Sequence, residues 1–338
     1  MRLHDMIHSF TRVLRASLGW WALPAVLLAA GPPLSNTESS EGELDFNFIP
    51  RAFQKDPFVD QTVITELTEA GKKIPPPSPS QPIYYLAESG GYRTEGHGAP
   101  NENPPPAAEI TAALQHALAV NGYLPATPMH PPQLLVVYFW GEHTNFDPGS
   151  GEFDHTAFPD AGHKNLLARA ALVGGTKFAE ELRQVLQKQD REDEMRTRMP
   201  PAVGGMLTSF GPLRMFVQRD YKSRQLYEES RADCYFVVAS AYHYASAIQG
   251  KRTLLWRTKM TLDSRGVAMR DTLPRLILNA GKYLGVDMPE AATITRRMKR
   301  GEHVTLGPLE VKEYRDPAAD RPLPSPTNTP EDREGRDR

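Results

Sequence analysis

The chain has 338 residues, of which 31 are proline, 39 are Lys or Arg and 41 are Asp or Glu, so its formal net charge is −2. This composition excludes a polytopic membrane protein, a collagen-like chain and a small disulfide scaffold. A charge this close to neutral also lacks the basic excess that nucleic-acid binding requires.

The first 31 residues carry the pattern of a secretory signal. Arg2, Arg12 and Arg15 precede an apolar run over 18–30. This run is too short to cross a bilayer and fits the core of a signal peptide. The letters LAAG at 28–31 resemble a lipoprotein box without its cysteine, so no lipid anchor is expected. We predict a signal peptide over 1–31 and export to the periplasm or cell envelope. The alternative is an uncleaved anchor, in which case membrane contact is limited to this segment.

Proline-rich stretches lie on both sides of the expected domain. Residues 32–81 start polar and acidic and end in PPPSPSQP at 75–82, which predicts a semi-rigid linker. Within it, 63–67 is interpreted as a short strand or helix. Prolines and charges over 315–338 predict a disordered tail. Between them we expect one α/β domain over 82–314, with an insertion at 141–230.

The first half of this domain alternates strand and helix. The aromatic run 83–86 predicts a strand, and the glycines between 90 and 98 predict a loop after it. Apolar residues at helical spacing predict a helix over 107–120 that ends at Asn121-Gly122. The apolar run 134–140 predicts a strand buried on both faces. This order favours a crossover between two parallel strands.

The insertion combines a polar loop with helices. We expect a loop up to residue 162 and a long helix over 164–189, with a charged continuation to 198. The pair Gly174-Gly175 within this helix lowers its stability, which predicts a close packing contact or a kink. A further helix is expected over 221–230.

The second half contains two more strands and a helix. Strands are expected over 235–244 and 254–262, with a hairpin connection at Gln249-Gly250. A helix over 273–284 would hold Pro274 in its first turn and stop at Gly285. A last strand is expected over 304–314. The predicted fold class is α/β, with α+β as the other possibility: a three-layer domain with a mixed sheet and helices packed on it.

The sequence lacks the common catalytic signatures. There is no phosphate-binding Gly-x-x-x-x-Gly-Lys-Ser/Thr, no complete dinucleotide fingerprint, no Gly-x-Ser-x-Gly elbow and no His-Glu-x-x-His pair. We therefore predict no catalytic residue and no cofactor.

One polar loop offers candidate metal ligands. The candidates are His143, Asp147, Asp154 and His155. Imidazoles and carboxylates that lie close together can bind a divalent cation, and α/β proteins place ligands at the carboxyl ends of strands. The spacing matches no metal template, and a solvated polar loop is the simpler interpretation. These four residues define the alternative hypothesis, a metal-dependent hydrolase.

Three other features have structural interpretations. Cys234 is the only cysteine and lies in an apolar run, so we expect it to pack as a small hydrophobic residue. His243 is interpreted as a strand-end residue. The basic cluster of Arg296, Arg297, Lys299 and Arg300 predicts surface ion pairs or contact with an acidic partner, because the overall charge does not favour nucleic acid.

Two segments carry a family resemblance. The helix end AVNGY at 119–123 is followed, after a proline-rich gap, by PQLLVV at 132–137, and GKRTLLWR at 250–257 precedes an amphipathic helix. Over about residues 82–285 the chain thus resembles uncharacterised bacterial cell-envelope families, often lipoproteins, with a compact α/β domain. The resemblance implies a non-catalytic envelope-associated domain and transfers no functional residue. The chain departs from it by the missing lipoprotein cysteine and by the insertion 141–230.

The sequence therefore predicts an exported envelope protein that acts as a non-catalytic interaction or assembly module. Its expected partner is another envelope protein, and no nucleic acid is expected to bind. The ligand and the oligomeric state are left open.

Overall fold

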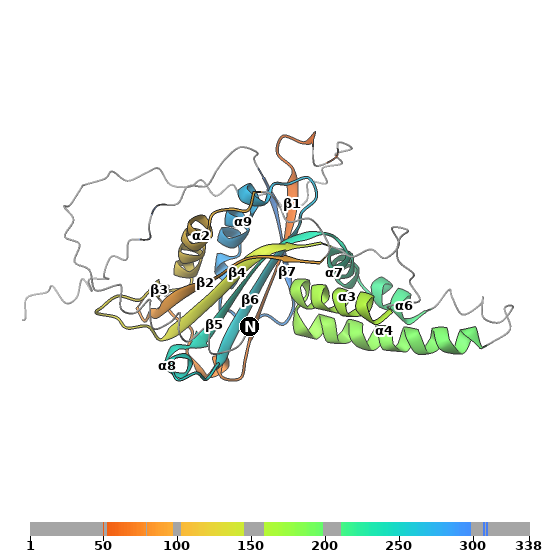
Figure 1. The fold of residues 1–338 in the computed structure, drawn as a ribbon, viewed down its shortest axis with the longest axis horizontal. Helices are drawn as coiled ribbons and strands as arrows, with labels where there is room; N and C mark the ends of the chain where they lie inside the picture. Colours follow the sequence, from red (N-terminus) through yellow and green to blue (C-terminus); the bar gives the residue numbers. More distant parts are fainter. Residues whose placement is uncertain are drawn as a thin grey trace, which may run out of the picture. The chain divides into compact units, whose positions relative to one another are not determined.

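The computed structural model of this chain describes residues 50, 53–78, 80–96, 103–144, 159–198, 211–298, 307 and 309. Within these residues one mixed sheet of seven strands has the order β3-β2-β4-β5-β6-β1-β7. Helices pack on both of its faces (Figure 1). The α/β class and the helix-covered mixed sheet predicted from the sequence are confirmed.

The parallel part of the sheet comes from the first half of the domain. Strand β2 (Ile83–Glu95) lies between β3 (Tyr123–Pro125) and β4 (Leu134–His143) and runs parallel to both. Helix α2 (Ala107–Val120) follows β2 and precedes β3 in the chain, and it has the bounds that its apolar spacing predicts. Its end is fixed by Asn121, whose side-chain amide donates to the carbonyls of Gly281 and Leu284.

The remaining strands are antiparallel. They are β5 (Cys234–His243), β6 (Leu254–Asp263), β1 (Phe58–Leu67) and β7 (Ala292–Arg297). The expected hairpin between β5 and β6 contains one short helix, α8 (Tyr244–Ile248), before Gly250 at a positive φ of 79°. Glycine adopts this left-handed conformation without steric cost.

One face of the sheet, which we call the α2 face, carries the larger core. Helix α2 packs there beside α9 (Met269–Asn279) and the short 3-10 helix η4 (Gly281–Tyr283). Alternating strand residues such as Val136, Tyr138 and Met260 are buried under these helices. Because side chains alternate along a strand, the residues between them belong to the opposite face.

The opposite face, which we call the α3 face, is covered in part by the insertion. It supplies α3 (Pro159–Val173), α4 (Gly175–Thr197), α6 (Pro212–Gln218) and α7 (Tyr221–Arg231). These helices gather at one end of the sheet, away from the end where α8 lies (Figure 1). The predicted single helix over 164–189 is broken into α3 and α4, because Gly175 has a φ of 83°.

Several boundaries differ from the sequence prediction. Strand β1 contains 63–67, interpreted as a short strand or helix, and extends back to Phe58 in the stretch predicted to be linker, because it pairs with β6 and β7 and buries Val59 and Val63. Strand β2 continues through Gly90 and Gly91, predicted as loop, by means of a bulge between Ser89 and Tyr92.

The helices and the carboxyl-terminal strand differ as well. Helix α9 starts at Met269, so Pro274 lies inside it rather than in its first turn. The short helix η2 (Gly71–Lys73), α6 and β7 were not predicted. The predicted signal 1–31, the tail 315–338 and almost all of the strand 304–314 lie outside the described residues. No helix in the described ranges is long and apolar enough to cross a membrane.

Candidate functional site

The predicted metal loop starts at the end of β4. His143 is the last residue of that strand and is 8% exposed. The other three candidate ligands, Asp147, Asp154 and His155, lie outside the described residues. Nearby, the imidazole of His163 faces the carboxylate of Asp190 at 3.7 Å on the neighbouring helix α4.

His143 is engaged by a buried arginine. Nη1 of Arg169, on α3, lies 2.9 Å from Nδ1 of His143 and also donates to the His143 carbonyl at 3.1 Å. A guanidinium can only donate, so Nδ1 is the acceptor and the ring proton of the neutral imidazole is on Nε2. Burial, together with the charge of Arg169, lowers the pKa of His143 to about 4. The ring is therefore neutral at pH 7, with Nδ1 accepting from Arg169.

Arg169 also fixes the end of helix α7. Its Nε donates to the Ser230 carbonyl at 2.6 Å, and Nη2 donates to the Ala232 carbonyl. These carbonyls lie at the carboxyl end of α7, where the helix dipole favours a cation. Because Arg169 is only 1% exposed, its charge is compensated by carbonyl oxygens of the domain and not by water.

Two other reactive side chains lie in this region, the buried Cys234 and the half-buried Glu229. Burial raises the pKa of the Cys234 thiol to about 12, so the thiol stays protonated and packs as the predicted hydrophobic residue. The carboxyl of Glu229 accepts from Thr62 at 2.5 Å and from Gln225 at 2.9 Å. Burial raises its pKa. Burial keeps the thiol protonated, and the Glu229 carboxyl already accepts two hydrogen bonds within the domain.

A second charged pair stabilises the junction between α3 and α4. Nζ of Lys259 donates to Glu66 at 2.9 Å and to the Ala171 carbonyl in the last turn of α3 at 2.7 Å. Glu66 also accepts from the Thr176 N–H in the first turn of α4 at 2.6 Å. Burial would raise the pKa of Glu66, but Lys259 and the Thr176 N–H outweigh it and the pKa is lowered. Each charge thus complements the dipole of the helix end that it touches.

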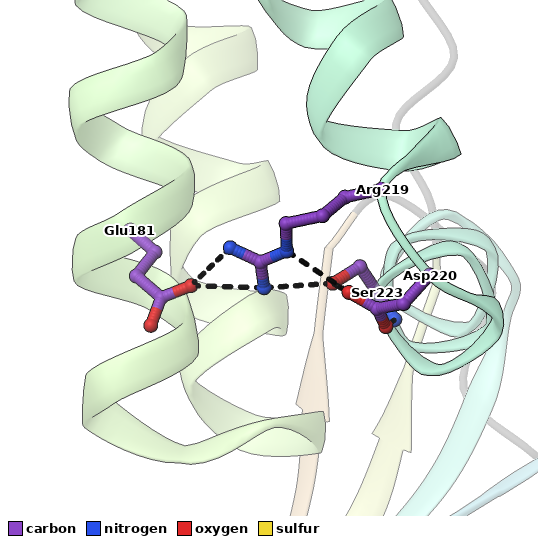
Figure 2. A network of polar contacts seen from close by, with 4 residues as sticks. All are labelled: Glu181, Arg219, Asp220 and Ser223. Carbon is purple, nitrogen blue, oxygen red and sulfur yellow. Dashed lines mark hydrogen bonds and ion pairs between the residues drawn. The ribbon is translucent and has the colours of Figure 1, made fainter.

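A third network joins α4 to α6 and α7 at the surface (Figure 2). The guanidinium of Arg219 donates to Glu181 of α4 at 3.3 Å, to Asp220 at 2.9 Å and to Ser223 at 2.9 Å. Asp220 is the N-cap of α7 and accepts from the Ser223 N–H at 2.7 Å. This pattern positions helices and leaves no group aimed at a ligand.

Part of the α3 face is not covered by helices α3, α4, α6 and α7, and its side chains are accessible. We call it the open half. Its seven side chains are exposed or half-buried: Leu86, Glu88, Arg93, Val137, Phe139, Tyr242 and Arg257. Leu86 is the most exposed apolar member, at 40%. Strand pairing sets Glu88, Val137, Ser240 and Arg257 side by side across four strands.

Two arginines stand on this apolar surface. The guanidinium of Arg93 lies over the Phe139 ring, 4.0 Å from its centroid. Arg257 donates from Nε to the Ser240 hydroxyl at 3.0 Å. Neither guanidinium forms an ion pair with a carboxylate in the described part of the chain. Glu66 pairs in register with Arg257, but its oxygens are held by Lys259 and Thr176.

Sequence reasoning identified His143 and missed the other groups. Arg169 and Lys259 gave no signal, because single cations in an amphipathic helix or strand usually face solvent. The open half was not predicted: 83–86 and 134–140 were expected to be strands, but 134–140 was expected to be buried on both faces, whereas Val137 and Phe139 are half-buried. The basic cluster contributes Arg296 and Arg297 to the exposed strand β7, and Arg297 lies over Phe58 at 4.7 Å. Lys299 and Arg300 lie outside the described residues.

Neither a metal centre nor a relative identifies the site. In the described ranges no group of three His, Cys, Asp or Glu side chains is placed to hold a metal ion. Comparison with protein-family models finds no match, and no curated protein matches the sequence. The open half is consequently the candidate site that the geometry offers.

Proposed function

We propose that this chain is a non-catalytic interaction module of the cell envelope, exported by its amino-terminal segment, which binds another envelope protein. The observation that carries the proposal is the contrast in polar bonding within the domain. In the covered part, hydrogen bonds within the domain engage four polar side chains: His143, Arg169, Glu66 and Lys259. The open half instead presents apolar side chains together with two arginines that have no carboxylate partner among the described residues.

Two properties support this proposal: the engagement of the buried polar groups and the composition of the exposed surface. A catalytic acid or base must reach the reacting atom and exchange its proton, which buried and fully bonded groups do not do. An apolar patch rimmed by arginine is the composition of protein interfaces, in which aromatic residues and arginine are enriched. The proposal needs no cofactor and no nucleic acid.

Cell fractionation tests the location. Cells would express the full chain and a version that starts at Ser35, both with a carboxyl-terminal epitope. We expect the full chain in the periplasmic or envelope fraction and the shortened chain in the cytoplasm. Cytoplasmic retention of the full chain would overturn the envelope assignment.

Metal analysis tests the non-catalytic character. The purified chain would be analysed for bound metal by mass spectrometry, and its thermal midpoint would be measured with and without Zn²⁺, Mn²⁺ or Mg²⁺. We expect no stoichiometric metal and no shift in midpoint. A stoichiometric metal that is lost in the Asp147→Ala/Asp154→Ala variant would support the hydrolase instead.

A further inference from the structure

The cations of the α3 face share one bonding pattern in its covered part. Lys259 donates to the Ala171 carbonyl at the carboxyl end of α3. Arg169 donates to the Ser230 and Ala232 carbonyls at the carboxyl end of α7. Each buried cation is thus met by the negative end of a helix, or by a carboxylate such as Glu66.

Arg257 and Arg93 also lie on the α3 face, but among the described residues neither is bonded to a helix end or to a carboxylate. Arg257 lies two residues before Lys259 on β6, so both side chains are on the same face of the sheet. Arg257 is half-buried and, among the described residues, donates to the Ser240 hydroxyl, while Arg93 stacks on Phe139. A stacked or hydrogen-bonded guanidinium retains N–H groups that can bind a carboxylate in a bidentate manner.

The strands beneath restrict how a ligand can bind. Strands β4, β5 and β6 are hydrogen-bonded to neighbours on both sides, so their backbone offers no site for an added strand. Within the described residues β3 pairs with β2 only at Ile83–Tyr85, and the bulge between Ser89 and Tyr92 interrupts the edge beyond it, so a strand added there would lie beside the sheet and not over Val137 and Phe139. A ligand that covers Val137 and Phe139 must therefore pack through side chains, as a helix does on a sheet.

We propose that the open half binds an amphipathic helix of a partner protein, with acidic side chains that contact Arg93 and Arg257 and apolar ones that cover Leu86, Val137 and Phe139. This inference rests on the proposed interaction role and names its surface and the chemistry of its partner. Glu88 at the β2 side repels acidic groups there, so the charges also select one orientation of the helix.

Site-specific photocrosslinking in the native cells tests the inference. The full chain would carry p-benzoylphenylalanine in place of Leu86, or in place of Val120 as the control. Val120 is 65% exposed and ends helix α2 on the other face of the sheet. Adducts would be isolated, and the crosslinked peptide would be sequenced by mass spectrometry.

Two charge-reversal variants complete the design. In Arg93→Glu/Arg257→Glu we expect the Leu86 adduct to fall at least about tenfold, because like charges replace two charge-assisted contacts. The matched control is Arg191→Glu/Arg224→Glu, which reverses two exposed arginines on α4 and α7 and should leave the yield unchanged. Circular dichroism and the thermal midpoint would verify that both variants fold.

The outcomes separate this inference from the proposed function. A Leu86 adduct with an acidic, helix-forming segment of another protein, lost only in Arg93→Glu/Arg257→Glu, supports it. A Leu86 adduct with lipid, with a second copy of this chain or with a segment lacking acidic residues overturns it, as does an adduct that persists after charge reversal. A protein adduct at Val120 alone overturns the inference and leaves the interaction module intact, whereas no adduct at either position contradicts both.

Discussion

The covered and open halves of the α3 face share strands β4, β5 and β6 but differ in how their cationic side chains are bonded. In the covered half, Arg169 and Lys259 are buried and each donates to a carbonyl at the end of a helix. In the open half, Arg93 stacks on the Phe139 ring and Arg257 donates to the Ser240 hydroxyl. Strand β6 shows both behaviours within three residues, at Lys259 and Arg257.

This difference separates polar groups that hold the fold from polar groups available to a partner. A buried charge that is fully hydrogen-bonded is costly to disturb, because its removal leaves desolvated partners behind. A surface arginine contributes little to stability. Substitutions in the two halves should therefore have very different effects on the free energy of unfolding, and the predictions below test this contrast.

The largest effect is expected for Arg169→Ala. The substitution leaves the carbonyls of Ser230, Ala232 and His143 without their donor and creates a cavity, so we expect a loss of about 4 kcal/mol in the free energy of unfolding. Urea denaturation followed by circular dichroism measures it. The control Arg183→Ala, in an exposed pair with Glu180, should cost about 0.5 kcal/mol or less. Equal losses in the two variants would show that Arg169 does not organise the covered half.

The second effect is a dependence of stability on pH that comes from His143. Its pKa is about 4 in the folded chain, against an ordinary value of 6.5. Between these values the unfolded state binds more protons, so the free energy of unfolding falls as the pH drops through this window, by about 3 kcal/mol at its lower end. Urea denaturation at a series of pH values from 7 to 4 would show this fall.

The variant His143→Asn isolates the contribution of the imidazole. Its amide oxygen can accept from Arg169 as Nδ1 does, but it does not titrate. We expect the difference between the wild type and the variant to grow with decreasing pH below about 6.5. Glu229 acts in the opposite sense, because its raised pKa favours folding at low pH, and it is present in both chains. Parallel pH profiles would contradict the assignment of this effect to His143.

A smaller effect is expected for Lys259→Met. The variant removes the donor of Glu66 and of the Ala171 carbonyl, and we expect it to cost about 2 kcal/mol. A double-mutant cycle with Glu66→Gln measures the coupling between the two side chains. Lys72→Met, which breaks an exposed pair with Glu69, is the matched control and should cost about 0.5 kcal/mol or less. A coupling of zero would show that the pair does not stabilise the α3–α4 junction.

The sequence predicted the elements whose pattern is strong and local. Helix α2 has the bounds that its apolar spacing gives, and the apolar run of β4 was predicted as a strand. At Gly174-Gly175 a close contact or a kink within one helix was predicted, and the structure has a full break between α3 and α4. Residues 63–67 of strand β1 were interpreted as a short strand or helix, but its first half was assigned to a linker, because prolines surround the strand and its partner β6 is distant in the sequence. Local composition carries no information about such long-range pairing.

The candidate site was less predictable than the fold. His143 was identified by its residue type, but the group that determines its chemistry is Arg169, which comes from another element. The open half depends on register across β2, β4, β5 and β6, and on where the helices of the insertion end. The bulge that carries β2 past Gly90 and brings Arg93 over Phe139 has no clear signature in a glycine-rich stretch.

The smallest effects on stability are expected in the open half, where they complete the contrast. Arg93→Ala removes a partly exposed cation–π contact, and Arg257→Ala removes one hydrogen bond to Ser240, so each should cost about 1 kcal/mol or less. Urea denaturation beside Arg169→Ala and Lys259→Met gives the comparison within one protein. If Arg257→Ala destabilises the chain as much as Lys259→Met does, Arg257 holds the fold together and is not available to a partner. If Arg257→Ala has a small effect on stability while the crosslink at Leu86 depends on Arg257, then strand β6 carries two cations with different roles. Lys259 stabilises the domain, and Arg257, two residues away, binds the partner.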